Sequence, residues 1–272
     1  MTGKNQIPKS RLEFLDELAE CIADEYCSNN VVQPNLIAKS QGVNYSFNNY
    51  GLYFDGLIEH KYGKFHIYIS LNEKLKHETS ARARFTFAHE LGHYFIDEHR
   101  NALRRGQTPS HPSFNNFTSK NPVEMEADYF AASLLMPRGR FVKDCEGKIF
   151  SYTLLDMLSK KYNTSLSATL IRFASIPKNH PICIICSKDG YIKWHRSSRD
   201  FPFKFLIGYN KKISAWTVAG EFFSSKTKRL TDREEVMANE WFEIDNSFNR
   251  KLYEKCIYAD SINLVMSIIW ED

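Results

Sequence analysis

Apolar positions in the first half of the chain recur at intervals of three and four residues, the spacing of helices that pack one face on a core. This spacing predicts helices at residues 12–26, 34–38, 77–99 and 122–136. Pro137 follows the last of them, where a helix is expected to stop. Residues 43–54 and 64–71 are rich in aromatic and β-branched side chains, which predicts strands of a small mixed sheet.

The second half of the chain changes from helical spacing to short strands. Residues 152–162 and 166–173 predict two short helices, a helix-turn-helix-like outline in which Ser165 suits the cap of the second helix. Beyond Pro181 two pairs of strands are predicted, namely 182–186 with 191–195 and 252–258 with 263–270. We therefore expect an α+β protein in three parts: helices with a small sheet over 1–148, a helix-turn-helix-like segment over 149–176, and an α/β domain over 177–272.

Charge and hydropathy exclude few classes of function, but they favour a location in the cytoplasm. Lys and Arg number 36 against 32 Asp and Glu, and a net charge of +4 is too mild to demand a nucleic-acid or membrane partner. Residues 1–11 are polar, and the longest apolar-rich run, 262–270, is too short to span a bilayer. We expect a cytoplasmic protein without a membrane segment.

The six cysteines are scattered over 272 residues, which is typical of reduced core residues and not of a disulfide scaffold. Cys183 and Cys186 form a Cys-x-x-Cys pair, which can hold half of a zinc site or act in redox chemistry. The sequence has no second such pair, and the two residues between these cysteines are β-branched. A strand is therefore the preferred interpretation.

Residues 89–93 read His-Glu-Leu-Gly-His. Residues four apart lie one above the other on a helix, so His89 and His93 can present two imidazoles to one ion, while Glu90, rotated by about 100°, flanks it. Gly92 would let a neighbouring backbone approach closely. The opposite side of this helix is apolar and can pack on a core, through Phe87, Leu91, Tyr94 and Phe95. The pattern indicates a tetrahedral zinc site that lines a cleft.

A hydrolytic zinc ion needs a third protein ligand and one open position. In the helix predicted at 122–136, Glu124 and Asp128 are four apart on one face, beside an apolar stripe. We assign Glu124 as the third ligand and Asp128 as the acceptor for a ring N–H of a ligand histidine. The alternative is that these acids only stabilise the N-terminus of their helix.

A strong resemblance to the ImmA/IrrE family of metallopeptidases is carried by two segments, Arg82-Ala-Arg-Phe-Thr-Phe-Ala-His-Glu-Leu-Gly-His93 and Glu124-Met-Glu-Ala-Asp-Tyr-Phe-Ala-Ala-Ser-Leu-Leu-Met-Pro137. The resemblance implies a zincin-like, thermolysin-like core that binds Zn²⁺ through two histidines and a glutamate. It also implies a helix-turn-helix-like middle segment and a C-terminal GAF-like domain with a sensory or docking role. The implied substrate is a helix-turn-helix repressor, cleaved to relieve repression of a stress-response or mobile-element regulon.

These residues predict a zinc endopeptidase in which Glu90 takes a proton from the attacking water and returns it to the leaving amine. The donor for the developing oxyanion stays open between three residues, His99, His111 and Tyr94. A peptide substrate is commonly held along an exposed sheet edge, and residues 64–70 are our candidate for that edge. The corresponding substrate-binding residues are Lys64, Phe65, His66, Ile67 and Tyr68.

A DNA-binding or ligand-sensing regulator with a non-catalytic metal site is the alternative from another class. The helices over 152–173 motivate it, because Lys160, Lys161 and Arg172 could meet phosphates, although specific DNA binding usually needs a longer basic face. The aromatic residues after position 200 could line a small-molecule pocket or, as is more common, form the core. Glu90→Gln separates the two classes, because a peptidase would keep its zinc and lose cleavage.

Overall fold

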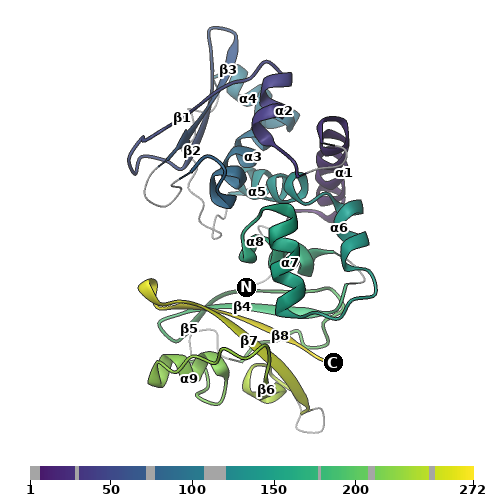
Figure 1. The fold of residues 1–272 in the computed structure, drawn as a ribbon, viewed down its shortest axis with the longest axis vertical. Coiled ribbons are helices and arrows are strands. Elements are labelled where there is room, and N and C mark those ends of the chain that lie inside the picture. The colour runs from purple at the N-terminus through teal and green to yellow at the C-terminus, as the bar shows by residue number, and fades with distance from the viewer. Residues whose placement is uncertain are drawn as a thin grey trace. The chain divides into compact units, whose positions relative to one another are not determined.

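The computed structural model describes seven ranges of the chain: 7–27, 31–71, 77–106, 121–176, 179–207, 212–244 and 249–272 (Figure 1). Helices and two separate sheets occur within these ranges, in agreement with the predicted α+β class. The chain divides into two compact units, residues 1–141 with 158–168 and residues 142–157 with 169–272. Three helices contribute residues to both units: α6 (Arg138–Cys145), α7 (Tyr152–Tyr162) and α8 (Leu166–Ser175). The three-part division of the sequence stays a prediction.

The sheet of the first unit has three strands, β1 (Asn44–Asn48), β2 (Gly56–Lys61) and β3 (Lys64–Ser70), in the order β1-β3-β2. The central strand β3 pairs in parallel with β1 and antiparallel with β2. The prediction that residues 64–70 form an exposed edge is therefore wrong. Spacing along the chain gives no information on which strand lies in the middle, and here both sides of β3 are taken by neighbours.

Strand β2 has no counterpart among the predicted elements. Its last residue pairs with the first residue of β3, so Tyr62 and Gly63 alone form the connecting turn. Both have positive φ, 51° and 75°, as a type I′ hairpin turn requires. Gly63 followed by an alternating strand was the sequence signal for this hairpin.

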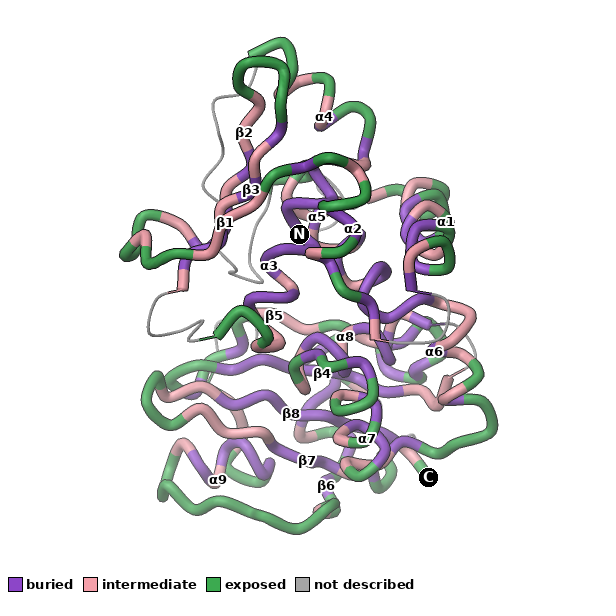
Figure 2. Tube along the Cα trace, turned by 45° about the horizontal axis from the view of Figure 1, so that its top comes forward, coloured by how far each residue is buried: buried purple, intermediate pink, exposed green. Residues whose placement is uncertain are grey.

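The first unit also contains five helices: α1 (Lys9–Tyr26), α2 (Pro34–Ser40), α3 (Ala81–Phe95), α4 (Asp97–Arg104) and α5 (Pro122–Leu135). Helices α2, α3 and α4 contact the sheet, while α5 packs on α3 and α1 packs on α5. Helix α3 is buried along most of its length (Figure 2). It packs against α5 at Gly92, where a Cβ atom would lie 3.2 Å from the Cα of Ala127. The close backbone approach expected at Gly92 is confirmed.

The single helix predicted over 77–99 is two helices in the structure. The helical path breaks at Ile96, whose φ of −74° and ψ of 112° are extended. Asp97 and Glu98 open α4, and acidic side chains are favourable in the first turn of a helix. Because Ile96 is fully buried, the break redirects the chain without exposing an apolar residue.

The second unit is built on an antiparallel sheet in the order β5-β4-β8-β7-β6. Its strands are β4 (Ile182–Lys188), β5 (Tyr191–Ser197), β6 (Glu234–Met237), β7 (Lys251–Ala259) and β8 (Leu264–Trp270). Both predicted strand pairs are found, β4 with β5 and β7 with β8. Strands β4 and β8 are buried along most of their length (Figure 2). Helix α9 (Val218–Ser225) and β6 were not predicted.

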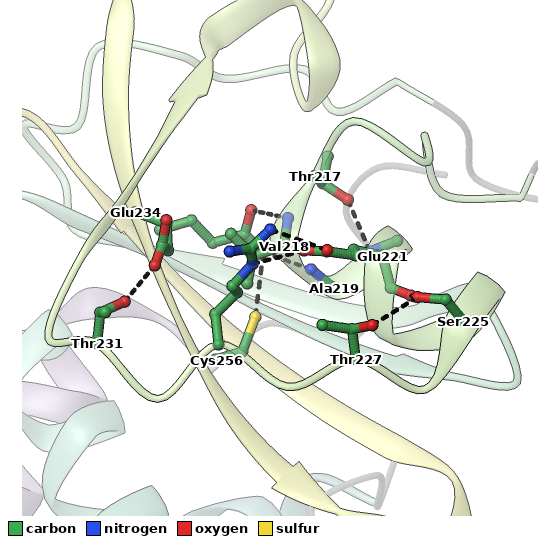
Figure 3. Close-up of polar contacts among 12 residues, drawn as sticks. Thr217, Val218, Ala219, Glu221, Ser225, Thr227, Thr231, Glu234 and Cys256 are labelled. Carbon is green, nitrogen blue, oxygen red and sulfur yellow. Dashed lines mark hydrogen bonds and ion pairs between the residues drawn. The ribbon is translucent and has the colours of Figure 1, made fainter.

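A buried carboxylate lies where α9 begins, in the region that Figure 3 shows around Val218, Ala219 and Cys256. The Glu254 side chain is fully buried and accepts the backbone N–H groups of Val218 and Ala219 at 3.0 and 3.1 Å. It also accepts hydrogen bonds from three side chains, those of Trp241, Cys256 and Ser267. Glu254 thus replaces water at the N-terminus of α9, where a negative charge is favourable.

The cysteine pair in β4 behaves as part of the core. Residues three apart point to opposite faces of a strand, so Cys183 and Cys186 cannot converge on one ion from there. Burial raises the pKa of the Cys183 thiol to about 12 and that of Cys186 to about 11. Both stay protonated at neutral pH, which disfavours the metal and redox interpretations.

No helix in the ranges that the structure describes combines the length and the apolar character needed to cross a bilayer.

Candidate metal centre

Helices α3 and α5 bring three donor side chains together. The Nε2 atoms of His89 and His93 are 3.1 Å apart, and the Glu124 carboxylate oxygens lie 3.2 Å from the first and 3.6 Å from the second. Among the described residues, this is the group of His, Cys, Asp or Glu side chains whose donor atoms could hold an ion, all within 4.8 Å of one another. The structure thus brings together the three residues predicted as ligands.

The three side chains of His89, His93 and Glu124, called the donor set below because they donate electron pairs to a metal, fit zinc. Zinc bonds to nitrogen and oxygen of about 2 Å in a tetrahedral arrangement put neighbouring ligand atoms about 3.3 Å apart, close to the separations seen here. Two imidazoles and one carboxylate leave a fourth position for water or substrate, as in hydrolytic sites. Both histidines are buried, while the Glu124 side chain is 18% exposed. The site therefore faces solvent on the side of α5.

Asp128 lies on the far side of the first histidine. Its Oδ1 is 2.8 Å from Nδ1 of His89, so the ring donates its Nδ1–H to this carboxylate. When the ring is neutral, this tautomer directs the electron pair of Nε2 toward His93 and Glu124. The position of Asp128 is the one expected of a residue that orients a metal ligand.

The charges around His89 favour its protonation. Burial disfavours the imidazolium, but the carboxylates of Asp128 and Glu124 outweigh that effect and raise the pKa of His89 to about 10. The same carboxylates that favour a proton on His89 would also favour a bound cation in its place. Metal binding would displace this proton, as it does at histidine sites generally.

Glu90 follows the first histidine on α3 and is fully buried. Its carboxylate lies against the first residue of β2, because a Cβ atom on Gly56 would be 2.5 Å from Oε1 of Glu90. The same Cβ atom would be 2.5 Å from Cγ2 of Thr86, one turn earlier on the helix. Gly56 was not among the predicted site residues, and this contact between distant segments leaves no local pattern in the sequence.

A second histidine–carboxylate pair lies behind the donor set. The rings of His93 and His99 are 5.2 Å apart, and Nε2 of His99 is 3.3 Å from a carboxylate oxygen of Glu126. Arg11 of α1 donates to the same Glu126 oxygen at 2.7 Å and thereby ties α1 to α5. Burial lowers the pKa of His99, which favours its neutral form.

The three residues named as candidates for the oxyanion donor, His99, Tyr94 and His111, differ in position. Tyr94 packs its ring on Phe65 at a centroid distance of 5.2 Å, on the side of the sheet, and His111 lies outside the described residues. His99 is therefore the candidate that lies beside the donor set. The choice of an oxyanion donor stays open.

The five residues predicted to bind substrate are engaged within the sheet. Phe65 and Ile67 are core residues, and Lys64 is exposed at the hairpin turn. His66 hydrogen-bonds Ser46 on β1 at 2.9 Å, and Tyr68 donates to Glu59 on β2 at 2.7 Å. Their assignment rested on an exposed edge, so its physical basis is lost.

Several residues of the second half that were named for phosphate contacts or a small-molecule pocket are buried in the core. Arg172 is 2% exposed, which leaves Lys160 and Lys161 as the exposed cations of the three named for phosphate contacts. Among the described aromatic residues after position 200, Phe201, Phe203, Phe222 and Trp241 are buried, whereas Phe205 and Trp216 are exposed.

Comparison with known proteins supports the resemblance seen in the sequence. Residues 46–174, a little under half of the chain, match the peptidase M78 family, described as the IrrE N-terminal-like domain. No curated protein matches. Among solved structures, a Mycobacterium tuberculosis transcriptional regulator is similar over 96% of this chain and 78% of its own, with a TM-score of 0.62 and 13% identity. At this identity the likeness shows a shared fold alone.

Proposed function

We propose, on the premise that residues 46–174 form a domain of the IrrE N-terminal-like peptidase family, that this chain is a zinc-dependent endopeptidase. One observation carries the proposal: the donor atoms of His89, His93 and Glu124 converge within 4.8 Å, next to the buried carboxylate of Glu90. This combination supplies the ligands and the base that metal-assisted peptide hydrolysis needs.

In the proposed mechanism His89, His93 and Glu124 hold the ion, and Asp128 keeps His89 in the correct tautomer. Zinc, when bound, supplies Lewis-acid chemistry that polarises a carbonyl and lowers the pKa of water. Glu90 takes the proton of the attacking water and later delivers it to the leaving amine. The buried position of Glu90 keeps bulk water away from this proton transfer.

The edge of β2 is our proposal for the place where the substrate backbone lies. In the described part of the chain β2 pairs with β3 alone. Because Ser70 donates its N–H to the carbonyl of Asp55, the alternate residues Gly56, Ile58 and His60 direct their backbone groups away from β3. An extended peptide can therefore add to this edge beside Glu90. N-methylation of alternate substrate residues should raise KM, and an even effect at every residue would contradict this arrangement.

A helix-turn-helix repressor is the proposed substrate. The support is the sequence resemblance to ImmA/IrrE peptidases and the fold shared with a protein described as a transcriptional regulator. Cleavage would remove the repressor and switch on the genes that it controls.

The test is to incubate the zinc-loaded protein with candidate repressors and compare it with Glu90→Gln. We expect the wild-type protein to cut a repressor at a defined bond, and the variant to retain zinc while losing at least about a hundredfold in rate. Glu13→Gln, on the exposed face of α1, is the matched control and should cleave normally. Equal activity of Glu90→Gln, or a regulatory effect on DNA that needs no cleavage, would favour the alternative, a regulator with a non-catalytic metal site.

A further inference from the structure

The first residue of β2 meets the carboxylate of Glu90 at a distance that only glycine permits. A Cβ atom on Gly56 would lie 2.5 Å from Oε1 of Glu90 and 2.5 Å from Cγ2 of Thr86. Favourable contacts between heavy atoms begin at about 3.5 Å. The φ of Gly56 lies outside the left-handed region, so the requirement for glycine is one of space and not of backbone conformation.

An ion pair fixes the strand at this position. Arg82, Thr86 and Glu90 follow at intervals of four along one face of α3. The half-exposed Arg82 side chain donates to an Asp55 carboxylate oxygen at 3.1 Å, and Asp55 directly precedes Gly56. Asp55 is itself buried and is held in the sheet by the N–H of Ser70. The beginning of β2 is therefore attached to the same helix face that carries the base.

We infer that Gly56 is a positioning residue for Glu90: the bare backbone of β2 forms one wall around the carboxylate, and the Asp55–Arg82 pair holds that wall in place. The inference rests on the proposed function, because it acts through the role of Glu90 in cleavage. Glu90 is fully buried, so its carboxylate has no solvent-filled space into which it can move freely. Its direction is set by what packs against it.

A methyl group at position 56 should displace Glu90 and leave the donor set intact. The three atoms nearest to the added methyl belong to Glu90 and Thr86, and not to His89, His93 or Glu124. Relief of the contact requires a shift on the order of 1 Å, and a misplacement of that size costs about a hundredfold in rate. The effect should appear in kcat, because the backbone groups that hold the substrate are unchanged.

The experiment compares Gly56→Ala with the wild type in three measurements. We expect kcat to fall by about ten- to a hundredfold with KM and zinc affinity within threefold, the affinity being measured by competition with a chromophoric chelator. In a crystal structure of the metal-free variant, the Glu90 carboxylate should have moved while His89, His93 and Glu124 have not. Asn44→Ala is the control, since this side chain is exposed on β1, at the opposite edge of the sheet from β2, and it should behave as wild type.

Unchanged kcat, or an unmoved Glu90 in the variant crystal, would overturn the inference. A parallel loss of zinc affinity would also overturn it, because it would assign Gly56 a structural role only. If Gly56→Ala fails to fold, Arg82→Gln and Asp55→Asn decide: each should lower kcat, and the double variant should be no worse than the stronger single one. A wild-type protein that cleaves nothing would refute the proposed function, while the crystal comparison would still test the placement of Glu90.

Discussion

Each unit of this protein gathers polar side chains around glutamate, and the two clusters follow opposite rules. In the second unit Glu254 is enclosed by donors: two backbone N–H groups, an indole N–H, a hydroxyl and a thiol. In the first unit the ligand atoms of His89, His93 and Glu124 converge on one another from two helices. A cluster of donors around one acceptor is complete by itself, whereas converging imidazole nitrogens and a carboxylate need a proton or a metal cation between them.

The comparison teaches how to separate a structural carboxylate from a functional one. Burial alone does not distinguish them, because Glu254 and Glu90 are both fully buried. The atoms that surround each carboxylate distinguish the structural one from the functional one. Glu254 is expected to govern stability, and the donor set of α3 and α5 is expected to govern metal binding and activity.

The largest effect should follow removal of a ligand. His93→Ala is expected to lower zinc affinity by about a thousandfold, since structural zinc sites gain about 10–16 kcal/mol from four ligands. The measurement is competition with a chelator of known affinity. His60→Ala, which removes a half-buried histidine of β2 outside the donor set, should leave the affinity unchanged. Equal losses in both variants would argue against this donor set.

The second effect concerns the stability of the other cluster. Glu254→Ala leaves five donors without their acceptor, at a cost of about 1–3 kcal/mol for each buried group that water cannot reach. We expect a loss of about 3–5 kcal/mol, since some donors will find other partners. Urea unfolding followed by tryptophan fluorescence measures it, because the indole of Trp241 bonds Glu254. The exposed Glu243→Ala is the control, and zinc affinity should not change in either variant.

A smaller effect is expected from the residue that orients His89. Asp128→Asn keeps the shape of the side chain and removes its charge, which should weaken zinc binding by about ten- to a hundredfold. The same chelator competition detects the change. An affinity equal to that of the wild type would show that Asp128 only stabilises its own helix, the alternative left open by the sequence.

The smallest effect is expected at a helix cap. The Thr217 side chain accepts the N–H of Gly220 at the start of α9, and Thr217→Ala should cost about 1 kcal/mol of unfolding free energy. Urea unfolding of this variant and of Ser224→Ala, an exposed position later in α9, provides the comparison. A loss of more than about 3 kcal/mol would mean that the cap also supports Glu254.

Local spacing predicted the parts of the site that a helix fixes by itself. His89 and His93 on α3, and Glu124 and Asp128 on α5, are pairs of residues four apart, and their relative directions follow from the helix alone. Local sequence also predicted the cap of α8: Ser165 accepts the N–H of Ala168 at 3.1 Å. These features need no knowledge of the tertiary fold.

Contacts between distant segments could not be predicted in this way. The order of strands in the first sheet depends on β1 pairing with β3, and the position of Gly56 against Glu90 depends on how that sheet meets α3. For Glu254 a signal existed, because in β7 it alternates with Leu252 and Cys256 on the buried face. A carboxylate at an inward position of a strand indicates a buried partner, even when the partner cannot be named.

Gly92 extends the argument to the choice of metal. By letting the backbone of Ala127 approach α3, it sets the distance between the two helices and therefore the size of the space among the ligand atoms. Separations of 3.1 to 3.6 Å suit a tetrahedral ion with bonds of about 2 Å, whereas calcium takes six to eight oxygen ligands and is poorly served by two imidazole nitrogens and one carboxylate. A bulkier residue at position 92 would widen this space, so the fit of the site to a small tetrahedral ion depends on a residue that supplies no ligand atom.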